Sequence, residues 1–497
     1  MSKAVLRVVN SIFCFYVIFC VGLLTWAVMY SGSGDGDTLE HVHSSWLVYH
    51  GKIPYKDFFQ HHNPLLWYIA APLVGAYEYS LRAVDAVNYL TVFVTALTMF
   101  FIFLINKNYI SNAFGGLVSA AFFAIPHDSL FSKDFKPDNF MVCALVIGIY
   151  FLLRHMKKKD LLSLSLSFFS FFISFMYTQK AALILLGIGI VILYLIYEKQ
   201  ISIESCIYSS LFPILLYVLY LGYLYHHDVL LMYFKANFEL NSHIPAVFDV
   251  RRFIYPSFEM MIPILFSMLG CVLFLYKDNL CTKVCGIIFI FEYIIRLFYF
   301  TPFVYYYAFL HAIASIYAGY TIYRICDKYK HFVWLVVAYF LILGSSYIHR
   351  YSYRITVGDS YKYGASGFVL SLTNPCDYIL NGYRIGYNLF GKDVDFIWNL
   401  LGQIDVIAAT IGIRPLADLE TLIREKRPKI IYGKNYYDTY LEYRGQIGVH
   451  PIHWISSHLL NEMYISLERD DLYILKPEYQ QHNCRYNPRT KTYEYYD

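Results

Sequence analysis

Charged residues are scarce in this sequence, where Asp, Glu, Lys and Arg together make up 15% of the 497 residues. The formal net charge is only +4 and is spread along the chain, which excludes nucleic acid as an expected partner. None of the ten cysteines stands in a C-x-x-C pair or in another zinc-ligand spacing. The sequence also lacks a Gly-rich phosphate loop and internal repeats, so we expect no nucleotide cofactor.

Apolar residues are correspondingly abundant: 58% of the chain is hydrophobic, 20% is aromatic and the mean hydropathy is +0.44. These values are typical of membrane proteins rather than of soluble domains. The first apolar run is long for a signal peptide and has no convincing cleavage site, so we interpret it as a retained helix. Runs near the ~20 residues that cross a bilayer predict eleven spans, at 12–30, 82–105, 111–125, 140–153, 161–177, 181–197, 206–225, 258–276, 284–300, 304–323 and 332–348.

The distribution of Lys and Arg predicts the orientation of these spans. If the N-terminus is cytoplasmic, every connection on that side is short and basic, as with Arg154 and the three lysines at 157–159. The odd number of spans then places everything after residue 348 outside. We therefore divide the chain into an all-α polytopic membrane domain at 1–348, whose first outer loop is 31–81, and a small extracytoplasmic α/β domain at 349–497.

The C-terminal domain is predicted from its mixed composition. Segments 405–411, 429–432 and 471–475 are expected strands, and segment 416–425 is an expected amphipathic helix. Cys376 and Cys484 are the cysteines of this exported tail, and an oxidising compartment would allow them to pair. The sequence supplies no distance between them, so their pairing stays open.

The first outer loop concentrates the ionisable residues. With a helix beginning near Asp37, the side chains of Asp37, Glu40, His41 and Ser44 share one face. Asp37 and Glu40 also have the spacing of a capping box, so their role could be to start that helix. Ionisable groups beside a bilayer are costly unless they line a wet cavity, which favours a functional site.

The second half of the loop predicts another helix, at whose start Asn63 and Pro64 are typical N-cap and first-turn residues. His61 and His62 then lie at the join between the two helices. The whole run resembles the first outer loop of bacterial polytopic glycosyltransferases of the GT-C class. This group is related to dolichyl-phosphate-mannose-protein mannosyltransferases and lipopolysaccharide-core glycosyltransferases, of the glycosyltransferase family 39 type. The residues in register are Asp37, Glu40, His41, Gly51, Pro54, Tyr55, Asp57, Phe58, Phe59, His61, His62, Pro64, Leu65, Leu66, Trp67 and Tyr68.

The resemblance implies a multi-pass enzyme of the bacterial inner membrane with its active site outside the cell. It implies transfer of a hexose or pentose, with inversion, from a polyprenyl-phosphate donor to an envelope glycan, lipid or protein. Asp37 would be the catalytic base with Glu40 beside it, and His41, His61, His62 and Asp138 would orient the acceptor. The sequence departs from the family at Thr38, where a second acid is common, and at Gln60, where Glu is common.

The donor phosphate is assigned to cations at the predicted outer ends of spans. Lys136 precedes Pro137 and Asp138 where the family usually has Arg-Pro-Asp, so it keeps the charge but loses the planar fork of Arg. Lys180 follows Thr178-Gln179 in a segment similar to a family element, and Arg296 stands four residues after Glu292 inside a span. Lys180 could instead extend to the lipid headgroups, and Arg296 could form a structural ion pair with Glu292.

Two other functions remain open. Many spans with ionisable groups also describe a transporter or a lipid-linked glycan flippase, although those groups would be expected in mid-span. A non-catalytic envelope assembly protein is the second alternative. The loop contains enough Asp, Glu and His for a divalent metal, but no ligand spacing compels one. The sequence does not identify the sugar, the acceptor or the oligomeric state.

Overall fold

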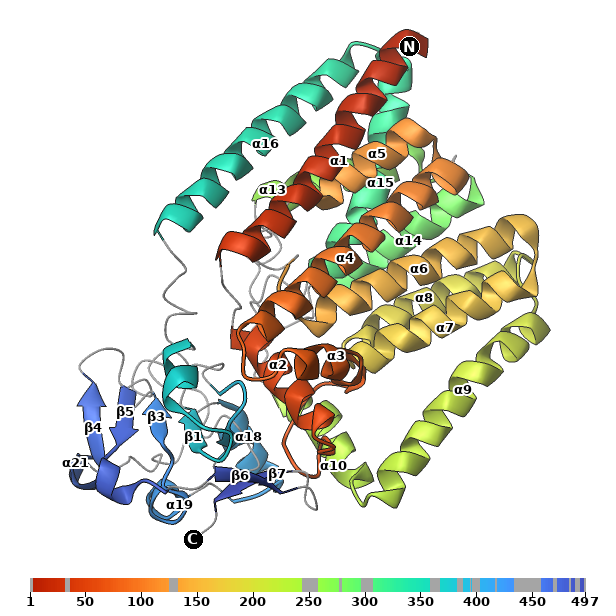
Figure 1. Ribbon diagram of the computed structural model, residues 1–497. Helices are drawn as coiled ribbons and strands as arrows, with labels where there is room; N and C mark the ends of the chain where they lie inside the picture. The colour runs from red at the N-terminus through yellow and green to blue at the C-terminus, as the bar shows by residue number, and fades with distance from the viewer. Residues whose placement is uncertain are drawn as a thin grey trace. The chain divides into compact units, whose positions relative to one another are not determined.

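The computed structural model describes residues 3–31, 36–124, 133–243, 258–276, 279–295, 307–357, 367–381, 388–393, 395, 403–415, 418–432, 457–467, 472–481, 484–487 and 492–495. Helices predominate among them (Figure 1). The chain divides into two compact units, each built from three stretches of sequence. The helical unit comprises Met1–Ser31, Asn88–Tyr220 and Pro245–Gly358. The mixed unit comprises Gly32–Val87, Leu221–Ile244 and Asp359–Asp497.

Each predicted span overlaps one helix of the described ranges. These helices are α1 (Lys3–Ser31), α4 (Arg82–Ile105), α5 (Ala113–Ala124), α6 (Pro137–Lys158), α7 (Leu161–Tyr177), α8 (Ala181–Tyr197), α9 (Ile203–His226), α13 (Phe258–Phe274), α14 (Leu280–Ile295), α15 (Ala308–Lys328) and α16 (Phe332–Val357). Within the described residues, four helical stretches are long and apolar enough to cross a bilayer: 3–30, 82–110, 137–158 and 203–226. The protein is thus an integral membrane protein, while the number of eleven crossings stays a prediction.

Helix α15 is the centre of the helical unit, since α5, α6, α13, α14 and α16 all pack against it. Its contact with α5 is close because two glycines meet there: a Cβ added to Gly319 would lie 2.6 Å from the carbonyl oxygen of Gly115 and against the hydroxyl of Ser119. Asn106, in a π-helical turn after α4, donates to Ser119 Oγ at 2.8 Å and to the Ile316 carbonyl at 2.9 Å. These bonds satisfy a buried amide and join α4, α5 and α15.

The mixed unit contains shorter elements. Its helices are α2 (Gly36–Tyr49), α3 (Leu65–Ala76), α10 (Leu230–Phe234), α11 (Leu240–His243), α18 (Gln403–Thr410), α19 (Leu419–Lys426) and α21 (Ser457–Met463). A five-stranded sheet has the order β2-β1-β3-β5-β4, formed by β1 (Tyr378–Asn381), β2 (Lys392–Asp393), β3 (Ile430–Tyr432), β4 (Tyr464–Leu467) and β5 (Leu472–Leu475). β6 (Cys484–Asn487) pairs with β7 (Thr492–Tyr495). Because this unit also includes α2 and α3, the domain boundary at residue 348 stays a prediction.

Three of the four elements predicted in the C-terminal segment are confirmed. Strand β3 lies within the predicted segment 429–432, β5 lies within 471–475, and α19 covers most of 416–425. Asp418 caps α19, since its carboxylate accepts from the Thr421 amide at 3.2 Å. The predicted strand at 405–411 is wrong, because these residues form α18. A short apolar run such as this one fits a buried strand and a buried helix equally well.

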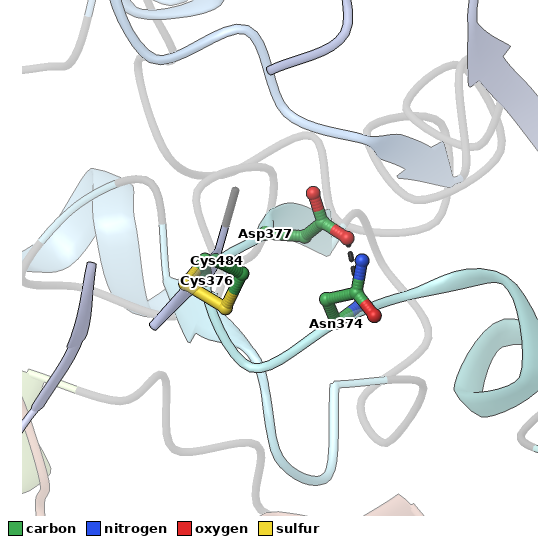
Figure 2. Close-up of a disulfide and its surroundings, with 4 residues drawn as sticks. All are labelled: Asn374, Cys376, Asp377 and Cys484. Atoms are coloured by element: carbon green, nitrogen blue, oxygen red, sulfur yellow. Dashed lines mark hydrogen bonds between the residues drawn. A yellow bond between two sulfur atoms is a disulfide. The ribbon is translucent and has the colours of Figure 1, made fainter. Parts of the chain in front are cut away.

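A disulfide joins Cys376, just before β1, to Cys484 at the start of β6, across a sequence separation of 108 residues (Figure 2). Next to it, the Asp377 carboxylate accepts from the Asn374 amide at 2.7 Å and closes the turn that leads into β1. The bond ties the two-stranded ribbon to the segment that leads into β1 of the larger sheet. The pairing that the sequence left open is therefore present in the structure.

Candidate active site

Helix α2 carries the predicted catalytic acids of the mixed unit. It begins at Gly36, so Asp37 is a first-turn residue, where the helix dipole favours a carboxylate. Asp37 is partly exposed, whereas Glu40 and His41 are buried on the same face. The predicted helix is confirmed, and its accessible acid is the one that the resemblance assigns as base.

Gln60 holds the buried acid in place. Its Nε2 donates to Glu40 Oε1 at 2.9 Å and to Ser44 Oγ at 2.7 Å, and the side chain is fully buried. An amide nitrogen only donates, so the bond to Glu40 is charge-assisted when that carboxylate is ionised. Sequence reasoning marked Gln60 as a departure from the family but assigned it no role.

Three histidine rings follow one another beside this acid. The Trp67 indole donates to His41 Nδ1 at 3.1 Å, which leaves the proton of a neutral His41 on Nε2. The ring of His62 lies 5.7 Å from that of His41 and 4.2 Å from that of His61, measured between centroids. The loop histidines that the sequence predicted to orient an acceptor are thus brought together.

The backbone carbonyls of His61 and His62 are held by hydrogen bonds from α11 and from a tight turn. Tyr55 has a φ of +68°, a left-handed conformation that costs a side chain about 1–2 kcal/mol. Its hydroxyl donates to the His62 carbonyl at 2.6 Å, and Asn241 donates to the His61 carbonyl at 3.1 Å. Asp57 accepts from the Ile53 amide at 2.7 Å, so its role here is to close the turn.

The predicted phosphate residues of the helical unit lie at the ends of α6 and α8. Lys136 immediately precedes α6, Asp138 is in its first turn, and Lys180 immediately precedes α8. Lys180 Nζ is 3.4 Å from Asp138 Oδ1, so two residues predicted for different roles form one ion pair. All three side chains are mostly buried.

A further buried lysine, which sequence reasoning missed, lies three residues before Lys136. Lys133 is 1% exposed, and its Nζ lies 3.7 Å from Asp134 Oδ1. The amide of Phe135 donates to Asn88 Oδ1 at 3.2 Å and attaches the segment to α4. The residues at and just before the starts of α6 and α8 thus include three lysines, 133, 136 and 180, and two aspartates, 134 and 138, an excess of positive charge suited to an anion.

Two predictions about ligands find no test here. Arg296 lies outside the described residues, although Glu292 is fully buried on α14. Within the parts of the chain that the structure describes, no three His, Cys, Asp or Glu side chains are grouped so that they could hold a metal ion.

Residues 65–225 match the family model of dolichyl-phosphate-mannose-protein mannosyltransferases. The match covers less than half of the chain and begins after Asp37 and Glu40. A sequence search of curated proteins gave no significant match.

Solved structures show the fold. It is similar to ArnT from Cupriavidus metallidurans in the apo state, with a TM-score of 0.59, 11% identity and coverage of 91% of this chain and 97% of that one. It is also similar to ArnT bound to undecaprenyl phosphate, with a TM-score of 0.56, 10% identity and coverage of 93% and 97%. A third similar structure is the oligosaccharyltransferase AglB from Archaeoglobus fulgidus in complex with an inhibitory peptide and a dolichol-phosphate. Its TM-score is 0.54 and its identity is 12%, with coverage of 89% of this chain and 71% of that one. The chain therefore has the fold of the GT-C glycosyltransferases, as its first outer loop predicted.

Proposed function

We propose that this protein is a membrane glycosyltransferase that moves a sugar from a polyprenyl-phosphate carrier to an acceptor of the cell envelope. The observation that carries the proposal is the α2 face, on which an accessible Asp37 stands beside a buried Glu40 held by Gln60. The GT-C fold supports it, because the structures of similar fold include complexes with undecaprenyl phosphate and dolichol-phosphate. The proposal names the donor class and an envelope acceptor. It does not specify whether the sugar is a hexose or a pentose, or which class of acceptor receives it.

The reaction needs one proton acceptor and one site for a leaving phosphate. As an acceptor hydroxyl attacks the anomeric carbon, its proton passes to the Asp37 carboxylate, a general-base step typically worth 10²–10⁴-fold in rate. The bond from that carbon to the phosphate oxygen breaks, and polyprenyl phosphate leaves with inversion at the sugar. The histidines of the loop, with Asp138, would orient the acceptor.

The lysines beside α6 and α8 are assigned to the leaving phosphate. Lys180, Lys136 and Lys133 would neutralise the charge that develops on it. Lys180→Ala should raise the KM for the donor more than the KM for the acceptor, because only the donor carries the phosphate. Lys158→Ala, in a predicted cytoplasmic turn, is the matched control. An unchanged donor KM in the Lys180 variant would remove this residue from the phosphate site.

The orientation is part of the same proposal. The disulfide between Cys376 and Cys484 favours an oxidising compartment for the C-terminal segment. The basic short connections favour a cytoplasmic N-terminus. We infer that the protein lies in a bacterial inner membrane with α2 and the C-terminal segment outside.

Mass spectrometry of envelope glycans, with the protein present and absent, tests the function. If the protein is a transferase, one class of envelope glycan, lipid or protein should lose the mass of a single sugar when the protein is absent. Its polyprenyl-phosphate donor should accumulate at the same time. Identical envelope profiles and unchanged donor levels would contradict the proposal.

A further inference from the structure

Helix α2 has a second face that the proposed reaction does not use. His43 and Trp46 lie on α2 and His50 directly follows it. They recur at spacings of three and four residues, along a face adjacent to the one that carries Asp37, His41 and Ser44. His43 and Trp46 are buried. A buried titratable side chain on the catalytic helix requires partners, and these come from the C-terminal segment of the mixed unit.

The partners of His43 are 346 and 350 residues away in sequence. Its Nε2 lies 2.8 Å from Asp393 Oδ2, and its Nδ1 lies 3.1 Å from the Leu389 carbonyl oxygen. Both acceptors are oxygens, so the ring satisfies both only when each nitrogen carries a proton. A protonated His43 therefore donates two hydrogen bonds to the same short segment.

That segment is itself held rigidly. Asn388 Nδ2 donates to Asp393 Oδ1 at 2.8 Å, and Asp393 pairs with Ile379 where β2 joins β1. A Cβ at Gly391 would lie 2.8 Å from Cδ1 of Ile379 and 2.9 Å from Asn388 Oδ1, so any other residue there would displace both side chains. The acceptors for His43 are thus built into the edge of the sheet.

Aromatic and charged contacts complete this face. The Phe390 ring packs edge-on against Trp46 at 6.1 Å and against Tyr79 at 5.6 Å between centroids. The other carboxylate packed against the face is that of Glu78, which accepts from Trp46 Nε1 at 2.6 Å and pairs with His50. On the sheet side, the ammonium group of Lys392 lies over the Tyr378 ring, 5.5 Å from its centroid. Among the residues that the structure describes, it is Asp393 that forms an ion pair with His43.

From this geometry we propose that residues 388–393 position the catalytic helix α2 through His43 and Asp393. The inference rests on the proposed function, because His43 acts only through the helix that carries Asp37 and Glu40. His43 and Asp393 are positioning residues, and neither touches the reacting atoms.

The pH dependence of the contact has a definite sign. Burial opposes protonation of His43, but the charge of Asp393 and the hydrogen bonds to Asp393 and Leu389 outweigh it and raise the pKa of His43 above 6.5. A histidine with a raised folded pKa contributes stability that is complete below its unfolded pKa. That contribution is lost as the pH rises through the folded value. The contact is therefore strongest in acid and weakens toward alkaline pH.

Thermal unfolding of the full-length protein in detergent tests the contact without any assay of activity. Asp393→Asn should lower Tm most at pH 5.5 and progressively less up to pH 9. Glu462→Gln is the matched control, because it removes the same charge beside His458, whose side chain is 86% exposed. The control should leave Tm unchanged. A Tm difference for Asp393→Asn that is constant with pH, or that grows as the pH rises, overturns the inference.

Sugar transfer tests the positioning role. Asp393→Asn should reduce kcat by about tenfold to a hundredfold with little change in KM, as a misplaced catalytic group does. The contact predicts that kcat of the wild type falls toward alkaline pH. His43→Gln retains a donor toward Asp393 but cannot titrate, so it should remove that fall. Full kcat in Asp393→Asn overturns the inference. Absence of transfer by wild type at every pH overturns the proposed function instead, and the Tm series separates the two failures.

Discussion

Gln60 contacts the buried Glu40 through an amide, at a position where a Glu would bring a second carboxylate against it. Relatives in the resembled family commonly carry Glu at this position, and here the amide donates to Glu40 and Ser44. Two carboxylates in hydrogen-bond contact cannot both ionise readily, so such a pair shares a proton near neutral pH. With Gln in place, position 60 adds no second carboxylate that would compete with Glu40 for a proton. The sequence shows this residue only as a departure from the family, because its partners Glu40 and Ser44 are seen only in the structure.

Gln60→Glu should therefore shift the pH–rate profile. Its acid side is expected to move to higher pH by about one unit or more, because a second carboxylate must first lose its proton. Gln60→Met is the matched control: it removes the donated hydrogen bond without adding charge, so its profile should move less. Steady-state rates between pH 4 and 9 provide the measurement. Superimposable profiles for wild type and Gln60→Glu would show that Glu40 does not depend on this amide.

At the scale of elements, the close contact of α5 with α15 supports the helical unit. Helix pairs in a membrane gain stability when small residues let their backbones approach. Gly115 and Gly319 form such a contact, which Ser119 and Asn106 surround with hydrogen bonds. Neither glycine was singled out from the sequence, because apolar helices contain many glycines and only the partner shows which of them matter.

Gly319→Ala should destabilise the protein, since the added methyl group must push α15 away from Gly115. Overpacking of this kind costs about 1–3 kcal/mol, and Tm in detergent should fall. Gly22→Ala on α1 is the control, because a Cβ there meets nothing within 4 Å and alanine favours a helix. Equal Tm values for the two variants would refute the assignment.

The sequence predicts the helices of this protein far better than its small elements. Long apolar runs at 82–105, 161–177 and 181–197 coincide with α4, α7 and α8 because bilayer thickness dictates their length and composition. The segment 405–411 was predicted as a strand, but residues 405–410 are helical, because a seven-residue segment with five apolar residues carries no decisive period. Asn63 and Pro64 were predicted at the N-cap and the first turn, yet α3 begins at Leu65, with Pro64 itself at the N-cap.

The candidate site was predictable only where its residues are neighbours in sequence. Asp37, Glu40 and His41 share a helix face by spacing alone. The ion pair of Lys180 with Asp138 and the bonds of His43 to residues 389 and 393 depend on tertiary folding. No period or motif connects positions so far apart in one sequence. A resemblance could supply Asp37 as the candidate base, but the contact of Gln60 that holds the neighbouring Glu40 in place came from the structure.

At the scale of the whole molecule, the proposed orientation makes the disulfide a useful reporter. Cys376 and Cys484 are paired, whereas the other eight cysteines are free and lie on helices. After mild reduction of intact spheroplasts, a membrane-impermeant maleimide should label Cys484, which is partly exposed, without lysis. A Cys376→Ser, Cys484→Ser double variant is the control and should lose that label. Labelling that requires lysis would place the C-terminal segment in the cytoplasm and contradict the orientation.

The central claim is that Asp37 withdraws a proton while a sugar leaves a polyprenyl phosphate. Its most direct test is the release of polyprenyl phosphate from a polyprenyl-phosphate sugar, followed by mass spectrometry in proteoliposomes that also contain an envelope extract as acceptor. Asp37→Asn, incorporated to the same level and with the same Tm as wild type, should release it at least about 100-fold more slowly. Retention of more than about a tenth of the wild-type rate would contradict the account, because a general base of ordinary strength contributes more than that.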